Sequence, residues 1–146
     1  MKKLIILLLI MVMALLTGCG GSGTQEEEFS VEGLEPAEQV QAIVEHYVEE
    51  EVWHGEITDI QVNKDADDAG KYVCLVWVDW DLENKPENAK GVLQAYADEL
   101  CYELSDNGNT SQFTIFFNAI QQGGLYKRGY SITDGQPTPT DEICQF

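Results

Sequence analysis

Carboxylates are the most abundant side chains in this sequence that could take part in acid–base chemistry. The 146 residues include 26 Asp and Glu but only 8 Lys and Arg, for a formal charge of −18. Asp79 and Asp81 alternate at the end of a Trp-rich segment, so an extended chain places both carboxylates on one side. Paired carboxylates serve as acid and base in glycoside hydrolysis. A chain with so many acids also brings carboxylates together by chance, and this pair alone does not identify a catalytic site.

Other catalytic and metal-binding patterns are missing from the sequence. His46 and His54 are the only histidines, and both fall on one expected helix about two turns apart. Asp65 and Asp67 have the spacing that starts a calcium loop, but Val76 stands where such a loop needs a bidentate Glu. No Gly-x-Ser-x-Gly elbow and no Cys-x-x-Cys pair occurs. We therefore predict no metal, no cofactor and no catalytic residue.

Two of the four cysteines are expected to share the core. Cys74 lies on the same strand face as Val76 and Val78, and Cys101 lies on the apolar stripe of a predicted helix. These two residues form either a disulfide or a pair of buried thiols, and both alternatives stay open. Cys144 has no evident partner, and Cys19 belongs to a different pattern.

Residues 1–19 have the arrangement of an export signal. Lys2 and Lys3 precede an uncharged apolar run over residues 4–16, which is the length of a signal-peptide core. The run ends in Leu16-Thr17-Gly18-Cys19, which resembles the lipobox of bacterial lipoproteins. The resemblance implies that Cys19 receives a diacylglyceryl thioether and becomes the N-terminus after residues 1–18 are cleaved off. We identify no family for the folded part of the chain.

Residues 19–33 are predicted to be the lipidated cysteine and a flexible acidic tether, because a Gly- and Ser-rich stretch is followed by three consecutive Glu. Loss of the leader removes two lysines and no acid, which changes the formal charge from −18 to −20. Phosphate binding requires a basic surface, so this charge argues against a nucleic-acid partner. We expect a protein held at the cell membrane on its extracytoplasmic side by the lipid on Cys19.

Residues 34–134 are predicted to form one small α+β domain. Apolar residues recur at helical spacing after Pro36, from Val40 to Val52, and again from Ala89 to Leu104. Asn84 and Glu87 have the spacing of a capping box for the second helix. Each helix is followed by two extended segments, at residues 57–62 and 71–81 and at residues 113–119 and 125–132. The expected architecture is α-β-β-α-β-β, a four-stranded antiparallel sheet with two helices on one face, followed by an irregular tail at residues 135–146.

The order of elements also suggests an internal duplication. A shift of 49 residues superposes the apolar positions of the first helix on those of the second. Two unrelated amphipathic helices would match in the same way. Duplication is therefore one interpretation of the pattern and chance is the other.

An uncovered sheet face is the expected binding surface. If both helices cover one face, the second strand turns Leu75, Trp77 and Asp79 toward the other, and Phe116 joins them if its neighbours point inward. The nearby basic pair Lys127-Arg128, between Tyr126 and Tyr130, either receives an anion or a partner's carboxylate or protects an edge strand by its charge.

We accordingly expect a lipid-anchored extracytoplasmic module that binds a protein or a cell-envelope ligand without catalysis. Two alternatives remain. One is a small envelope hydrolase that uses carboxylates near Asp79 and Asp81. The other is self-association through Trp77.

Overall fold

The computed structural model describes residues 29–83 and 86–146 of the chain. The leader, Cys19 and most of the tether lie outside these residues. The described elements are, in order, α2 (Pro36–Glu51), β1 (Gly55–Lys64), β2 (Tyr72–Trp80), α3 (Ala89–Asn107), β3 (Thr110–Ala119), β4 (Gly124–Thr133) and β5 (Gln136–Cys144). The fold is α+β, with two helices and one five-stranded mixed sheet.

Both helices form where the apolar stripes predict them. Pro36 occupies the first turn of α2, and the backbone N–H of Glu35 donates to Glu38 Oε2 at 3.1 Å. The α2 stripe is buried at Val40, Ile43, Val44, Tyr47 and Val48. Helix α3 begins later than the sequence predicts, at Ala89, because Asn88 accepts the N–H of Gly91 at its N-terminus. Asn84 lies outside the described residues.

The sheet differs from the expected four antiparallel strands in two ways, a parallel pairing at its centre and a fifth strand at its edge. The strand order β1-β2-β3-β4-β5 follows the chain, and strands β1 and β2, β3 and β4, and β4 and β5 pair antiparallel. Strands β2 and β3 are parallel, whereas we predicted an all-antiparallel sheet. The reason is that α3 lies between them, and a helical crossover returns the chain to the end where β2 began.

The tail is a fifth strand and not the irregular segment predicted for residues 135–146. Asp134 and Gly135 make a two-residue turn with φ of 51° and 71°, and β5 then pairs with β4 from Gln136 to Cys144. Positive φ at both central residues is typical of the tight turns that match strand twist. Pro137 and Pro139 are tolerated because β5 is an edge strand, where a missing N–H breaks no inner ladder.

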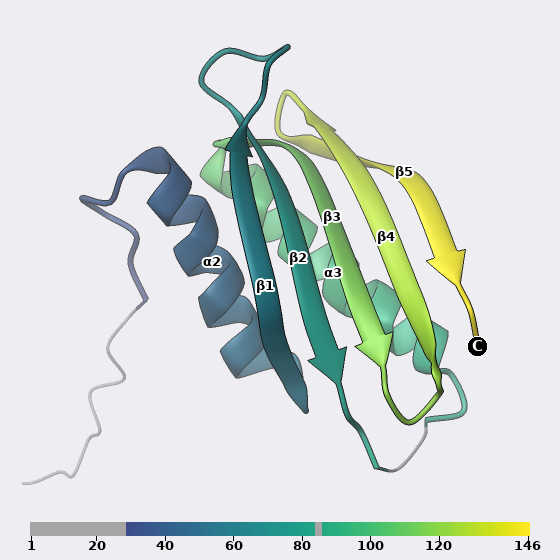
Figure 1. The fold of residues 1–146 in the computed structure, drawn as a ribbon. Coiled ribbons are helices and arrows are strands. Elements are labelled where there is room, and N and C mark those ends of the chain that lie inside the picture. The colour runs from purple at the N-terminus through teal and green to yellow at the C-terminus, as the bar shows by residue number, and fades with distance from the viewer. Residues whose placement is uncertain (1–28, 84–85) are drawn as a thin grey trace, which may run out of the picture.

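The molecule has two layers, with the core between them. Both helices lie behind the sheet in Figure 1, and the near face of the sheet carries no described element. Inward-facing side chains of β2 and β3 meet the helices, and Trp80, Phe113 and Phe117 are fully buried there. Burial of this apolar surface is the main favourable contribution to folding.

The arrangement of the strands argues against an internal duplication. The pairs β1-β2 and β3-β4 follow the same order across the sheet, but the parallel β2–β3 pairing gives them opposite strand directions. Superposing one pair on the other in sequence order would require turning the sheet over, which moves the helix to the opposite face. Both helices lie on one face, so no rotation relates the two units (Figure 1).

Candidate functional site

The face of the sheet that turns away from both helices is the candidate site, and we call it the open face. Residues of β2 alternate strictly: Cys74, Val76 and Val78 are buried, whereas Leu75 and Trp77 are half-buried on the other side. The same alternation in β3 buries Ile115 and Phe117 and places Phe116 on the open face. This resolves the side on which Phe116 lies.

An aromatic pair occupies the middle of the open face. Trp77 and Phe116 are register partners on the parallel strands, and their rings stack at 4.9 Å between centroids with planes 4° apart. The register continues from Phe116 to Lys127 on β4 and to Ile143 on β5. The Lys127 ammonium lies 5.7 Å from the centre of the Phe116 ring and pairs with Asp141. These register partners thus form a strip of aromatic and aliphatic surface across the sheet: Trp77, Phe116, Lys127 and Ile143. Asp141 neutralises the charge of Lys127 in this strip.

Polar side chains flank this strip. Asp79 lies two residues beyond Trp77 on β2, and its Oδ1 accepts the Asn118 amide at 2.9 Å. Leu75 lies two residues before Trp77 on β2 and faces the same side of the sheet. Of the predicted surface residues, Leu75, Trp77, Asp79, Phe116 and Lys127 therefore share the open face.

The remaining predicted surface residues, Tyr126, Arg128 and Tyr130, lie on the helix side of the sheet. Tyr126 is fully buried and Tyr130 is 4% exposed, so neither belongs to an accessible surface. Residues of one strand that differ by one position face opposite sides, which separates Lys127 from both neighbours. Strand β4 is also an inner strand, because β5 covers its outer edge. The interpretation of the basic pair as protection of an edge strand is therefore wrong, and the other interpretation, a seat for an anion, meets two cations that lie on opposite faces and already pair with carboxylates.

The Arg128 guanidinium is already paired with two carboxylates of this chain. Its Nε donates to Asp98 at 3.1 Å and its Nη1 donates to Glu142 at 3.1 Å. Glu142 also pairs with Lys90 at 2.7 Å and accepts the Tyr126 hydroxyl at 2.8 Å. The hydrogen bond from Lys90, followed by that from Tyr126, lowers the pKa of Glu142. The cluster joins α3, β4 and β5.

The two carboxylates of the alternative catalytic pair accept hydrogen bonds from different side chains. Asp79 bonds Asn118 on β3, whereas Asp81 accepts the Gln121 amide at 2.6 Å, in the turn after β3. The two histidines lie elsewhere: Phe29 stacks on His46 at 3.9 Å, and His54 holds a φ of 60° in the turn before β1. The four cavities described for the molecule include none of these four residues.

Cys74 and Cys101 both point into the core, as predicted, and both are free thiols. Burial raises the pKa of each to about 12. Cys144 is a free thiol that is half-buried at the end of β5. This arrangement corresponds to the alternative of two buried thiols.

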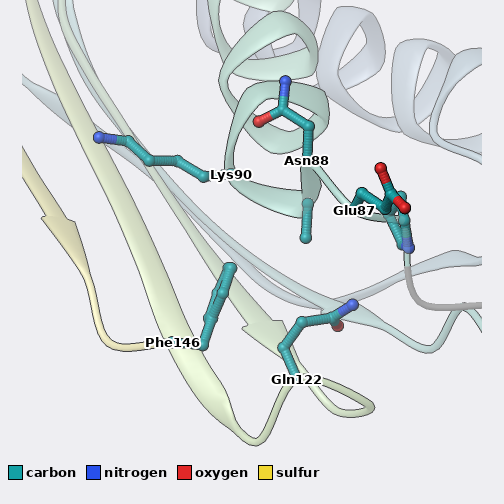
Figure 2. A pocket seen from close by; sticks show the side chains of 7 residues that line it. Glu87, Asn88, Lys90, Gln122 and Phe146 are labelled. Carbon is teal, nitrogen blue, oxygen red and sulfur yellow. The ribbon is translucent and has the colours of Figure 1, made fainter.

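The largest of the four cavities, about 370 Å³, lies at the start of α3. Figure 2 shows Gln122 and Phe146 facing the start of α3, which Asn88 caps, while Lys90 extends toward the sheet. Its lining includes Pro86, the first residue described after the gap at 84–85. We assign it no ligand.

A second cavity, of about 270 Å³, lies at the other end of α3. Thr110 Oγ1 is buried there without a hydrogen-bond partner among the described residues, and Lys71 reaches across to donate to the Gly108 carbonyl. The remaining lining combines two carboxylates, two hydroxyl side chains, Ile132 and glycine backbone, and it selects no ligand class.

Sequence reasoning missed the contribution of both outer strands to the open face. Glu56 and Asp59 on β1 lie opposite Asp79 and Trp77, and Asp141 and Ile143 come from β5. The Asp134-Gly135 turn signal would have revealed β5. The acidic positions of β1 depend on a register shift between Ile57 and Asp59, for which the sequence carries no signal.

Comparison with protein-family models, curated proteins and solved structures finds no match to this chain. This agrees with the sequence analysis, which identified no family for the folded part. Each helix of the described residues is too short or too polar to cross a membrane. Within those same residues, no three metal-ligating side chains cluster.

Proposed function

We propose that this protein is a lipid-anchored binding module of the extracytoplasmic face of the cell membrane, which engages a protein or cell-envelope ligand through the open face. The observation that carries the proposal is the Trp77–Phe116 stack on a sheet face with no cover among the described elements. Aromatic side chains are enriched where proteins meet partners, because they bury a large area with few rotatable bonds. The lipobox supports the location, since it implies an acyl anchor on Cys19.

Self-association through Trp77 is a less favoured form of this proposal, because a second copy would bring the same acidic surface. The hydrolase alternative has no cavity at Asp79 or Asp81 among the four described. Neither self-association nor hydrolysis explains the aromatic strip better than binding of a partner of different composition does.

Photocrosslinking in living cells tests the proposal. A photoreactive amino acid at Thr114, which lies beside the aromatic pair, should give a discrete adduct in the intact membrane-bound protein. The same amino acid at Tyr102, 59% exposed on α3, is the matched control and should give none. Equal adducts at both positions, or an adduct at Tyr102 alone, would contradict the assignment of the binding face.

A further inference from the structure

The open face carries two carboxylates directly opposite one another. Glu56 on β1 is the antiparallel register partner of Asp79 on β2, so both side chains leave the sheet on the same side. Register partners have Cβ atoms about 4.5–5.5 Å apart, and like charges in this position destabilise a sheet. Within residues 29–83 and 86–146, neither carboxylate forms an ion pair. The exposed Glu56 and the half-buried Asp79, whose Oδ1 accepts the Asn118 amide, therefore lie opposite one another with no cation paired to either among the described residues.

The carboxylate pair borders the aromatic strip. Asp79 is two residues from Trp77 on β2, and Asp59 on β1 is the register partner of Trp77. The cation of this face, Lys127, lies on the far side of Phe116 and already pairs with Asp141. The open face thus combines apolar surface in its middle with unneutralised negative charge along its β1–β2 side.

These features specify the chemistry of the occupant. We propose that the open face binds a basic, apolar polypeptide segment, whose Lys or Arg side chain lies between Glu56 and Asp79 while its apolar side chains cover Trp77 and Phe116. This inference rests on the proposed function. Charge-assisted hydrogen bonds to two carboxylates offset the repulsion that the free protein sustains. A second copy does not supply this chemistry, because it presents the same carboxylates and a lysine that is already paired.

A peptide of alternating lysine and leucine is the probe, and its counterpart with glutamate in place of lysine is the control peptide. The full chain, matured in a bacterial host and held in neutral detergent, is titrated by fluorescence anisotropy at about 0.15 M salt, where exposed charges more than about 8 Å apart are largely screened. We expect the lysine peptide to bind and the glutamate peptide not to bind. Equal binding of the two peptides would overturn the proposal.

The deciding comparison uses two pairs of substitutions with the same change in charge. Glu56→Gln with Asp79→Asn should weaken binding of the lysine peptide about tenfold, as expected for the loss of about 1.4 kcal/mol of charge-assisted bonding. Glu49→Gln with Glu50→Gln, on the exposed side of α2, should change it less than about twofold, since these charges lie away from the open face. An equal loss in both variants would attribute binding to general acidity and overturn the proposal.

Stability provides a readout that is independent of binding. Glu56→Gln should raise the urea midpoint, because it removes repulsion from Asp79. A lowered midpoint would contradict the like-charge pair on which the proposal stands.

Crosslinking separates failure of this inference from failure of the proposed function. If the Thr114 adduct persists at full yield in the Glu56→Gln, Asp79→Asn variant, the open face binds a partner but not through these charges, and the inference is overturned alone. An adduct with the mass of two copies of the chain would likewise overturn it. Loss of the adduct in this variant, with retention in the Glu49→Gln, Glu50→Gln control, supports both.

Discussion

At the scale of single residues, alternation along the inner strands decides what each side chain can do. Lys127 and Arg128 are adjacent in sequence, yet one lies on the open face and the other is enclosed by Asp98 and Glu142 beneath the sheet. The same rule places Cys74 in the core and its neighbour Leu75 outside. A pair of adjacent residues in a strand is therefore poor grounds for a shared site.

The thiols give a prediction at this scale. In the folded protein at pH 8, iodoacetamide should modify Cys144 and spare Cys74 and Cys101, because burial excludes the reagent and raises their pKa to about 12. In denaturant without a reductant, all three should react, as mass spectrometry would show. Modification of Cys144 alone in denaturant would instead indicate a Cys74–Cys101 disulfide.

At the scale of elements, strand β5 contributes both to the sheet edge and to the two faces of the sheet. The strand covers the edge of β4, contributes Asp141 and Ile143 to the open face, and sends Glu142 to the cluster around Arg128. Its turn is tied to α3, because the Ser105 hydroxyl donates to the Gly135 carbonyl at 2.6 Å. The C-terminal strand thus supports both faces of the sheet.

Substitution in this turn tests the contribution of β5. Gly135→Ala should destabilise the protein by about 1–2 kcal/mol, because its φ of 71° lies in the left-handed region that a side chain disfavours. Asp134→Asn is the matched control and should have a small effect, since Asn tolerates positive φ. Urea unfolding followed by Trp fluorescence measures both. An unchanged midpoint for Gly135→Ala would show that the turn contributes little to stability.

At the scale of the whole molecule, charge and anchor act in opposite directions. The proposed lipid on Cys19 would hold the chain at the membrane, while a formal charge of −20 after loss of the leader is repelled by anionic headgroups. The folded part would then stand away from the surface on its tether. Such a position leaves the open face accessible to a partner.

Substitution of the lipobox cysteine tests the anchor. Cys19→Ala should abolish incorporation of labelled palmitate and leave residues 1–18 attached, because the thiol is the group that the lipobox resemblance predicts to be acylated before cleavage. Mass spectrometry of the membrane and soluble fractions measures both effects. Normal cleavage after Gly18 in this variant would contradict the assignment.

The sequence predicted the local elements well, for identifiable reasons. Periodicity located both helices, and alternation in β2 correctly separated Trp77 from the core. It failed for β5, where Pro137 and Pro139 obscured the Asp134-Gly135 turn. It also failed at Tyr126 and Tyr130, which look like surface aromatics until α3 is placed over them.

The sequence by itself therefore determined both helices, the first four strands, the inward face of β2 and the lipobox pattern, because these depend on residues that are near neighbours in the chain. Only the tertiary structure decided that β2 and β3 run parallel, that Phe116 stacks on Trp77, and that Glu56 lies opposite Asp79. Each of these depends on register between strands, which is fixed by packing among distant residues and by a bulge that no local pattern marks. The candidate binding face belongs to this second class, since it exists only once five strands lie side by side in register.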